Sequence, residues 1–286
     1  MSNIKILSDS TCDLSAELIQ RYDIAILPLH VLLGDEEYDD GPGLSPDMIY
    51  KWSDKHDTTP KTSAPSIDHA IAAFKPHLAE GKEIIAFAIS ASMSASCQIM
   101  EMAAQELDAD DRVFVINSQN LSTGIGLLVL EAAVMAQNGA SSGEIIEHIK
   151  KMRPLVRASF VVDTLTYLHR GGRCSGLAAL AGGVLRLHPR IAVKEGVMHP
   201  EKKYRGRSSH VIMNYVKDME KDLLTAKKDR VFITHSGCEQ AVIDEVRSYL
   251  ESLQVFDEIL ITRAGGVISS HCGPGTLGVL FIAGEE

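Results

Sequence analysis

Ten residues near the C-terminus combine a histidine, small hydroxyls and glycines in a pattern suited to holding an anion. The stretch 269–278 reads Ser-Ser-His-Cys-Gly-Pro-Gly-Thr-Leu-Gly, and a short apolar segment follows it. Gly273 and Gly275 permit backbone conformations closed to other residues, and Pro274 fixes φ and has no N–H. Such a loop can direct His271 and backbone N–H groups at an anionic group. The alternative is a tight turn before a last strand, with a histidine beside it.

Three further segments carry clusters of small hydroxyl and amide side chains. They span residues 8–11, 90–96 and 117–123, and each follows a short apolar run typical of a buried strand. One such cluster is usually a helix cap. In α/β sheets, however, ligands bind beyond the carboxyl ends of the strands. Three clusters at corresponding positions therefore predict a polar pocket.

These clusters lie in a first half where short apolar strands alternate with helices. We expect strands over 4–7, 24–33, 83–89 and 112–116, and a loop over 34–43. Helices are expected over 16–22, 45–55, 66–79, 97–107, 124–137 and 142–153, the last behind a capping box at Ser141 and Glu144. The strands are apolar on both faces, which is the pattern of a mostly parallel sheet covered by helices.

The second half predicts another α/β unit. We expect strands over 157–162, 230–236, 256–263 and 277–283, a hairpin of 190–194 with 197–204, and helices over 177–187, 208–225 and 239–253. The fold class is therefore a two-domain α/β protein, with an N-terminal domain over 1–158 and a C-terminal domain over 159–286. No low-complexity linker separates the two, so we expect them to pack closely.

Composition narrows the function classes. A length of 286 residues suits about two domains, and a net charge of -10 without a long basic run argues against a nucleic-acid surface. No stretch reaches the roughly 20 apolar residues that cross a bilayer, and the N-terminus lacks a signal-peptide pattern. The five cysteines are odd in number and never form C-x-x-C, which favours reduced thiols and a cytoplasmic location.

Several familiar chemistries have no motif here. A Walker A sequence, an H-E-x-x-H motif and a G-x-S-x-G elbow are missing, and Gly124-Ile125-Gly126 lacks the third glycine of a dinucleotide fingerprint. The acidic loop 34–43 lacks the spaced oxygen ligands of an EF-hand. We therefore expect no metal and no cofactor. What remains is hydroxyls, glycines, His271 and the arginine of 171–173, a set suited to holding a carboxylate or phosphate without bonding to it covalently.

Four sequence blocks resemble the DegV family. They are the opening 8–14, the segment 62–66 (Thr-Ser-Ala-Pro-Ser), the pair 160–165 and 171–173, and the block 271–275 (His-Cys-Gly-Pro-Gly). They occur in the family's order, and the resemblance covers nearly the whole chain. It implies a two-domain protein that binds a long-chain fatty acid and carries it, without catalysis of its own. The carrier would present the carboxylate to a separate ATP-binding fatty acid kinase subunit, which forms the acyl phosphate.

The resemblance also implies a site. Thr62 and Ser94 would hydrogen-bond the carboxylate, with the amide of Ala95 beside them, Ser63 as a further donor and His271 closing the site. Arg173 would support the site or the approach of the phosphate, and the other supporting positions are Ser96, Gly273 and Gly275. The apolar segment 177–187 is a candidate wall for the acyl tail. Without the resemblance, this segment would be ordinary core, Ser94 a helix cap, Arg173 a surface ion pair and His271 a satisfied buried histidine.

The chain departs from the family in the serine block and before Ser118. The family usually has S-S-x-L-S-G-T-Y where residues 90–97 read Ser-Ala-Ser-Met-Ser-Ala-Ser-Cys. Ala95 replaces a glycine, Ser96 replaces a threonine but keeps a hydroxyl, and Asn117 stands where an aspartate is usual. These changes leave the ligand class and bear on chain-length preference and head-group geometry.

Two other functions and one surface stay open. Ser94 as nucleophile with His271 as base would give an acyl hydrolase or acyltransferase, although no carboxylate is evidently placed to orient the histidine. A metabolite-kinase component, with His271 holding a carbonyl substrate, is a further alternative. A basic cluster in this acidic chain is either a solvated face or a docking surface for the kinase subunit: Lys202, Lys203, Arg205 and Arg207.

Overall fold

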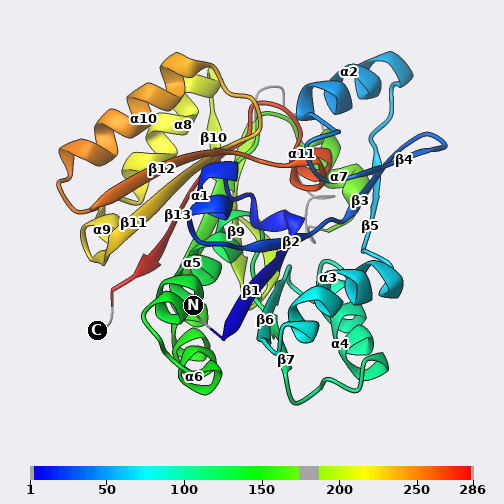
Figure 1. Cartoon of the computed structure of the whole chain (residues 1–286). Helices are drawn as coiled ribbons and strands as arrows, with labels where there is room; N and C mark the ends of the chain where they lie inside the picture. The colour runs from blue at the N-terminus through cyan, green and yellow to red at the C-terminus, as the bar shows by residue number, and fades with distance from the viewer. Residues whose placement is uncertain (1–2, 174–186, 285–286) are drawn as a thin grey trace.

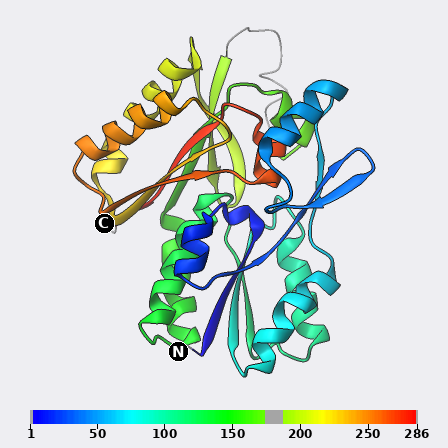
Figure 2. The same ribbon diagram turned by 45° about the horizontal axis from the view of Figure 1, so that its top comes forward.

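A computed structural model describes residues 3–173 and 187–284 of the chain. The described part is built in alternating helical and sheet layers, with a third, small sheet at one side (Figure 1; Figure 2). Two sheets, one of four and one of six strands, form the body of the molecule. The α/β class expected from the sequence, with a parallel sheet and a second sheet unit, is confirmed.

The first sheet is entirely parallel, in the order β2-β1-β6-β7. Its strands are β1 (Ile4–Asp9), β2 (Ala25–Leu27), β6 (Glu83–Ala88) and β7 (Val113–Asn117). Ile84, Ala86 and Ala88 pack toward α3 (Ile67–Ala79) and α4 (Ser96–Glu106). Ile85 and Phe87 pack toward the opposite helices, α5 (Thr123–Gln137) and α6 (Ser142–Met152). Because alternate side chains of a strand face opposite ways, strands apolar at every position are covered on both faces, as expected.

The second sheet is mixed, in the order β10-β9-β8-β13-β11-β12. Only β11 and β12 pair in parallel; the other neighbours are antiparallel. Its strands are β8 (Val156–Val161), β9 (Leu187–Lys194), β10 (Val197–Arg205), β11 (Ala226–His235), β12 (Glu258–Arg263) and β13 (Leu277–Ala283). The outer face is covered by α8 (Ser208–Asp218), α9 (Glu220–Leu224) and α10 (Gln240–Ser252), as Figure 1 shows. The second sheet begins at β8, so the expected domain boundary between 158 and 159 falls inside a strand.

Helix α5 lies between the two large sheets. Every residue from 123 to 133 is buried, including Glu131, whose carboxylate pairs with Lys227 at 2.9 Å and His148 at 3.1 Å. A Cβ on Gly126 would lie 2.8 Å from the Leu14 side chain. The glycines of this helix therefore allow close packing, and no dinucleotide is needed to explain them. The packing makes five layers: helices, sheet, α5, sheet and helices.

The third sheet, β4-β3-β5, is antiparallel and was missed by the sequence reasoning. The expected single strand 24–33 is wrong: it breaks at Pro28 and Leu29 into β2, in the parallel sheet, and β3 (His30–Leu33). Proline has no N–H for a strand ladder, so the chain leaves the first sheet there. The expected loop 34–43 contains β4 (Glu36–Asp39), and β5 (Lys61–Ser63) completes the sheet.

Smaller corrections concern helices. The expected helix 208–225 ends at Asp218, and α9 follows it after Met219. The expected loop around 269–272 belongs to a helix, α11 (Gly266–Cys272). The remaining helices are α1 (Ala16–Arg21), α2 (Pro46–His56) and α7 (Thr166–Gly171), with 3-10 turns at Ser10–Cys12 and Arg153–Leu155. The expected helix 177–187 lies outside the described residues except for Leu187, which begins β9. Within the described ranges, no helix combines the length and apolar character needed to cross a membrane.

Candidate functional site

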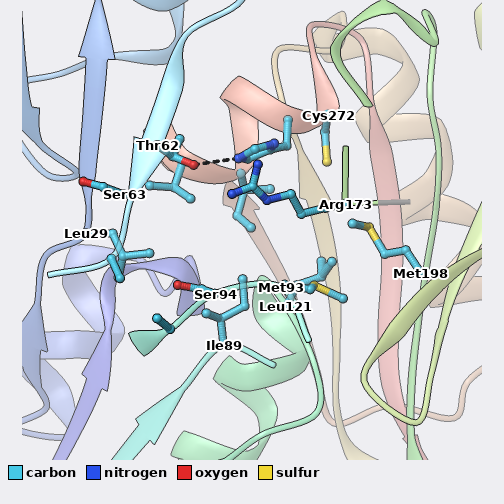
Figure 3. A pocket seen from close by; sticks show the side chains of 15 residues that line it. Leu29, Thr62, Ser63, Ile89, Met93, Ser94, Leu121, Arg173, Met198 and Cys272 are labelled. Carbon is cyan, nitrogen blue, oxygen red and sulfur yellow. Dashed lines mark hydrogen bonds between the residues drawn. The ribbon is translucent and has the colours of Figure 1, made fainter. Parts of the chain in front are cut away.

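A cavity of about 250 Å³ lies where the parallel sheet, the small sheet and α11 meet (Figure 3). Five residues with polar side chains line it: Thr62, Ser63, Ser94, Arg173 and His271. The rest of the wall is mainly apolar: Leu29, Ala64, Ile89, Met93, Ala95, Leu121, Met198, Val267, Ile268 and Cys272. The cavity is therefore amphipathic, and both halves of the chain contribute to it.

Among the described residues that line the cavity, Thr62 and His271 are joined by a hydrogen bond between elements far apart in the sequence. Thr62 lies on β5, in register with Val31 of β3, and His271 lies in the last turn of α11. The distance between Thr62 Oγ1 and His271 Nε2 is 2.8 Å, and Figure 3 shows this bond as a dashed line. Since α11 packs against β3 and β5, the small sheet sets the position of both partners.

The imidazole of His271 is neutral. Desolvation in the cavity wall, and secondly the nearby Arg173 guanidinium, lower its pKa from 6.5 to about 4. Its Nδ1 is buried and makes no hydrogen bond with any described residue. An orphaned buried acceptor is better tolerated than an orphaned N–H. We therefore assign the proton to Nε2, which donates to Thr62 Oγ1, and the Thr62 hydroxyl proton is left free to donate into the cavity.

Gly171 explains part of the Gly-Gly-Arg motif. A Cβ at this position would lie 2.4 Å from His271 Nδ1, so only a glycine leaves room for the imidazole ring. Arg173, two residues later, is exposed and donates through Nη1 to the Gly171 carbonyl at 2.7 Å. Figure 3 places its guanidinium close to the Thr62–His271 pair. The motif thus seats the histidine and brings a permanent positive charge to the cavity mouth.

Ser94 stands at the other side of the cavity, in the turn that leads into α4. Its hydroxyl lies 3.0 Å from the Ser96 hydroxyl and accepts from the Ser96 N–H at 3.3 Å. The N-cap residue of α4 is Ala95, which offers no side-chain cap. Ser94 therefore lies one residue before the N-cap, yet its hydroxyl accepts from the first amide of the helix, that of Ser96.

Gly273 and Gly275 shape the end of α11 and do not line the cavity. Both have positive φ, 74° and 73°. A Cβ on Gly273 would lie 2.6 Å from the Tyr167 ring, and one on Gly275 would lie 3.0 Å from the Asp163 side chain. The histidine of the His-Cys-Gly-Pro-Gly block is thus helical, and its glycines serve the turn that follows.

The three hydroxyl clusters have different roles, so the expected pocket built from all three is only partly seen. Of the first cluster, Thr11 donates to the buried Asp9 carboxylate at 2.5 Å, and no residue of 8–11 lines the cavity. Asn117 accepts from the Ala91 and Gln119 amides, which shapes a turn. Only the cluster 90–96 brings a hydroxyl to the cavity. The sequence reasoning missed the apolar wall residues Leu29, Met198 and Val267, because no motif marks them.

The expected tail wall at 177–186 lies outside the described residues. The described apolar wall continues into a second, smaller void of about 30 Å³, which shares Leu121, Ile268 and Cys272 with the first. Within residues 3–173 and 187–284, no group of three or more histidine, cysteine or acidic side chains is arranged to hold a metal ion.

The arrangement needed for serine nucleophilic catalysis is not formed among these residues. Such a site needs the nucleophile hydrogen-bonded to its base, and the base oriented by a third group. Here the Ser94 hydroxyl pairs with Ser96, whereas His271 Nε2 pairs with Thr62. His271 Nδ1 meets no carboxylate in the described part of the chain.

Layered sheets around a cavity lined by both polar and apolar side chains define an α/β protein with an amphipathic pocket. A family model described as the uncharacterised DegV family matches residues 3–284. A DegV domain-containing protein of Clostridium perfringens is 31% identical over 282 residues, 99% of each chain. The chain therefore belongs to the DegV family, as the four sequence blocks had indicated.

Two solved structures give this membership a functional context. A DegV family protein from Thermus thermophilus, described by its fatty acid binding, has a TM-score of 0.88 at 29% identity and covers 99% of this chain and 100% of its own. A stearic-acid-binding protein from Eubacterium ventriosum has a TM-score of 0.83 at 28% identity, with 98% of each chain covered. Structural neighbours of this chain thus bind fatty acids.

Proposed function

We propose that this protein binds a long-chain fatty acid, with the carboxylate between Thr62 and Ser94 and the tail along the apolar wall. The observation that carries the proposal is the amphipathic cavity, whose wall combines the hydroxyls of Thr62 and Ser94 with apolar side chains. Thr62 is supplied with a hydrogen bond from the neutral His271, so its own proton is free for the ligand. Each methylene buried in the apolar part contributes about 0.8 kcal/mol. The structural neighbours that bind fatty acids support the same ligand class.

Native mass spectrometry of the purified protein, paired with analysis of an organic extract, tests this proposal. We expect a co-purified fatty acid in stoichiometric amount, or uptake of one by the emptied protein. A protein that neither carries nor takes up a fatty acid would overturn it. A serine-directed fluorophosphonate, tried in parallel, should not label Ser94, because no described base is hydrogen-bonded to that hydroxyl.

We also propose that the protein carries its ligand to a separate ATP-dependent fatty acid kinase subunit. Arg173 supports a carrier role, because its guanidinium is exposed at the cavity, where it can meet an approaching phosphate. The kinase subunit would then add the phosphoryl group while the tail stays buried.

The basic cluster is the candidate docking surface, and its members differ. Lys202 pairs with Asp218 at 2.5 Å, on the α8 side of β10. Lys203, Arg205 and Arg207 are exposed, and none of the three makes an ion pair with any described residue. Because side chains alternate along a strand, Lys203 and Arg205 of β10 point away from the face that Lys202 uses. They are the charges free to meet an acidic partner surface.

Reversing the two free charges of β10 tests the docking surface. In Lys203→Glu combined with Arg205→Glu, assembly with the kinase subunit should weaken at least tenfold, while fatty-acid affinity stays within twofold. Lys150→Glu combined with Lys151→Glu, on the exposed face of α6, is the matched control for net charge. Unchanged assembly in the first variant would reject this surface.

A further inference from the structure

Two buried carboxyl groups hold the first turn of α11. Asp40 Oδ1 accepts the Gly266 N–H at 2.6 Å, and Asp13 Oδ1 accepts the Gly265 N–H at 2.8 Å. Both aspartates belong to the N-terminal half of the chain, and only 4% of Asp40 and 6% of Asp13 are exposed. The helix they hold belongs to the C-terminal half. These hydrogen bonds therefore fasten a helix of one half to the other half.

The contact is close enough that a side chain at the helix start would have to displace its neighbours by a few tenths of an ångström. A Cβ on Gly265 would lie 3.1 Å from Asp40 Oδ1 and 3.2 Å from Asp13 Oδ1. A Cβ on Gly266 would lie 3.0 Å from Asp40 Oδ1 and 3.1 Å from the Leu44 side chain. The two glycines thus let the backbone amides approach the carboxylates closely.

The second oxygen of each carboxyl group also accepts a hydrogen bond. Ser10 donates to Asp40 Oδ2 at 2.8 Å and accepts the Leu29 N–H at 3.1 Å, and Leu29 lines the ligand cavity. Ser122 donates to Asp13 Oδ2. The first hydroxyl cluster of the sequence, whose purpose the ligand cavity did not explain, thus supports Asp40.

Helix α11 carries this hold to the ligand site. It has seven residues, six of them buried, and His271 lies five residues after Gly266. At about 1.5 Å per residue, the fastened amide and the histidine are about 7.5 Å apart along the axis. Val267 and Ile268 of the same helix line the cavity. A shift of the first turn therefore displaces the imidazole and part of the apolar wall together.

We infer that Asp13 and Asp40 are positioning residues that set the place of His271 against Thr62; this inference rests on the proposed function for its effect on ligand affinity. Burying carboxyl groups without a cation is costly, and neither makes an ion pair with a described residue. Desolvation raises the pKa of Asp13 to about 8 and that of Asp40 above its ordinary value, which expresses this cost. Two apolar side chains in place of the aspartates would be sufficient for packing. The carboxyl oxygens, in contrast, accept from the amides of Gly265 and Gly266 and so fix the position of the helix start.

The first test replaces Asp40 by asparagine, which keeps an acceptor oxygen but lacks the charge. In Asp40→Asn, fatty-acid affinity should fall about tenfold, because an amide offers one acceptor oxygen where Asp40 accepts from both the Gly266 N–H and the Ser10 hydroxyl. The ring ¹⁵N signals of His271, assigned from their loss in His271→Gln, should shift in the protein without ligand. Gly266→Ala places a methyl group against Asp40 Oδ1 and so disturbs the same contact from the helix side. It should produce the same two changes.

A double-mutant cycle separates positioning from general weakening. If Asp40 acts through the histidine, Asp40→Asn should lower affinity by no more than about twofold in the His271→Gln background. Val246→Ala, in the buried face of α10, is the control for lost stability. It should lower the melting temperature and leave the His271 signals and the affinity unchanged.

The outcomes are distinguishable from failure of the proposed function. Fully additive losses in the cycle, or unchanged His271 signals with unchanged affinity in Asp40→Asn and Gly266→Ala, would overturn the inference. If the wild-type protein binds no fatty acid while the His271 signals still shift, the positioning role stands and the proposed ligand falls.

Discussion

The Thr62–His271 pair defines what the polar end of the cavity can do. The imidazole is neutral, so it brings no charge to a bound carboxylate. Its contribution is directional, because it occupies the acceptor side of the Thr62 hydroxyl and points the remaining proton at the ligand. Positive charge comes instead from Arg173, which is exposed and permanently protonated.

Removing the Thr62 hydroxyl should therefore weaken head-group binding with little change in shape. Thr62→Val is expected to lower fatty-acid affinity about tenfold, since it deletes one hydrogen bond to a charged group and leaves His271 Nε2 unpaired. Titration with a fluorescent fatty acid measures the loss. Thr225→Val, at an exposed position, is the matched control and should bind normally.

The histidine should not titrate in the neutral range. Because its folded-state pKa is about 4 against an ordinary 6.5, the unfolded chain binds more protons between these two values. This group's contribution to the free energy of unfolding therefore rises with pH from about 4 to 6.5 and is constant above. Ring signals of His271, followed by NMR from about pH 8 to 5.5, should stay fixed. A midpoint near 6.5 would contradict the desolvated environment.

At the scale of elements, the β9–β10 hairpin closes the cavity from the C-terminal half. Its turn residue Gly196 accepts a hydrogen bond from the Ser90 hydroxyl at 2.7 Å, and Met198 beside it lines the cavity. Gly196 has φ of 80°, and a Cβ there would lie 2.5 Å from Ser90 Oγ. The serine cluster before α4 thus contacts the hairpin through Ser90 and also supplies the Ser94 hydroxyl that lines the cavity.

Gly196→Ala should therefore destabilise the protein by more than backbone strain alone would. Gly139 has a similar φ of 85° with nothing within 4 Å of its would-be Cβ, so Gly139→Ala measures strain alone, about 1 kcal/mol. We expect Gly196→Ala to lower the free energy of unfolding by about 2 to 3 kcal/mol, and to weaken fatty-acid binding through Met198. Equal losses in chemical denaturation of the two variants would mean that the hairpin is not seated on Ser90.

The sequence predicts an element well where local patterns determine it, and poorly where pairing with a distant segment does. Buried strands such as β6 and helices with caps, such as α6 behind Ser141, follow from local patterns. The small sheet does not, because β5 has three residues and only its pairing with β3 makes it a strand. For the site, the sequence motifs pointed to Thr62, Ser94 and His271, and all three line one cavity. That they bind a carboxylate stays a prediction.

At the scale of the molecule, α5 makes one core for both large sheets. Ile85 of the parallel sheet and Phe160 of the mixed sheet belong to the same buried cluster around Leu128. Residues of α5 belong to this cluster too, so the helix covers a face of each sheet. The two halves expected from the sequence as domains therefore share one hydrophobic core.

We expect the described halves to unfold together. Leu128→Ala should lower the free energy of unfolding by about 2 to 5 kcal/mol, because the side chain is fully buried. Calorimetry should show a single transition, shifted but not split. Leu224→Ala, at a half-exposed position, should change stability by less than about 1 kcal/mol. Two separate transitions in the wild type would mean that α5 belongs to one half only.

Both halves of the chain contribute walls to the cavity, so a molecule bound there affects how firmly the two halves are held together. A molecule seated there touches β5 and the loop before α4 on one side, and α11 and β10 on the other. Such a molecule links the two halves by contacting both of them. A ligand at one hundred times its Kd adds about 2.7 kcal/mol to the free energy of unfolding. If the proposed ligand binds, we therefore expect the loaded protein to be digested by a protease more slowly than the empty one, and limited proteolysis measures the difference.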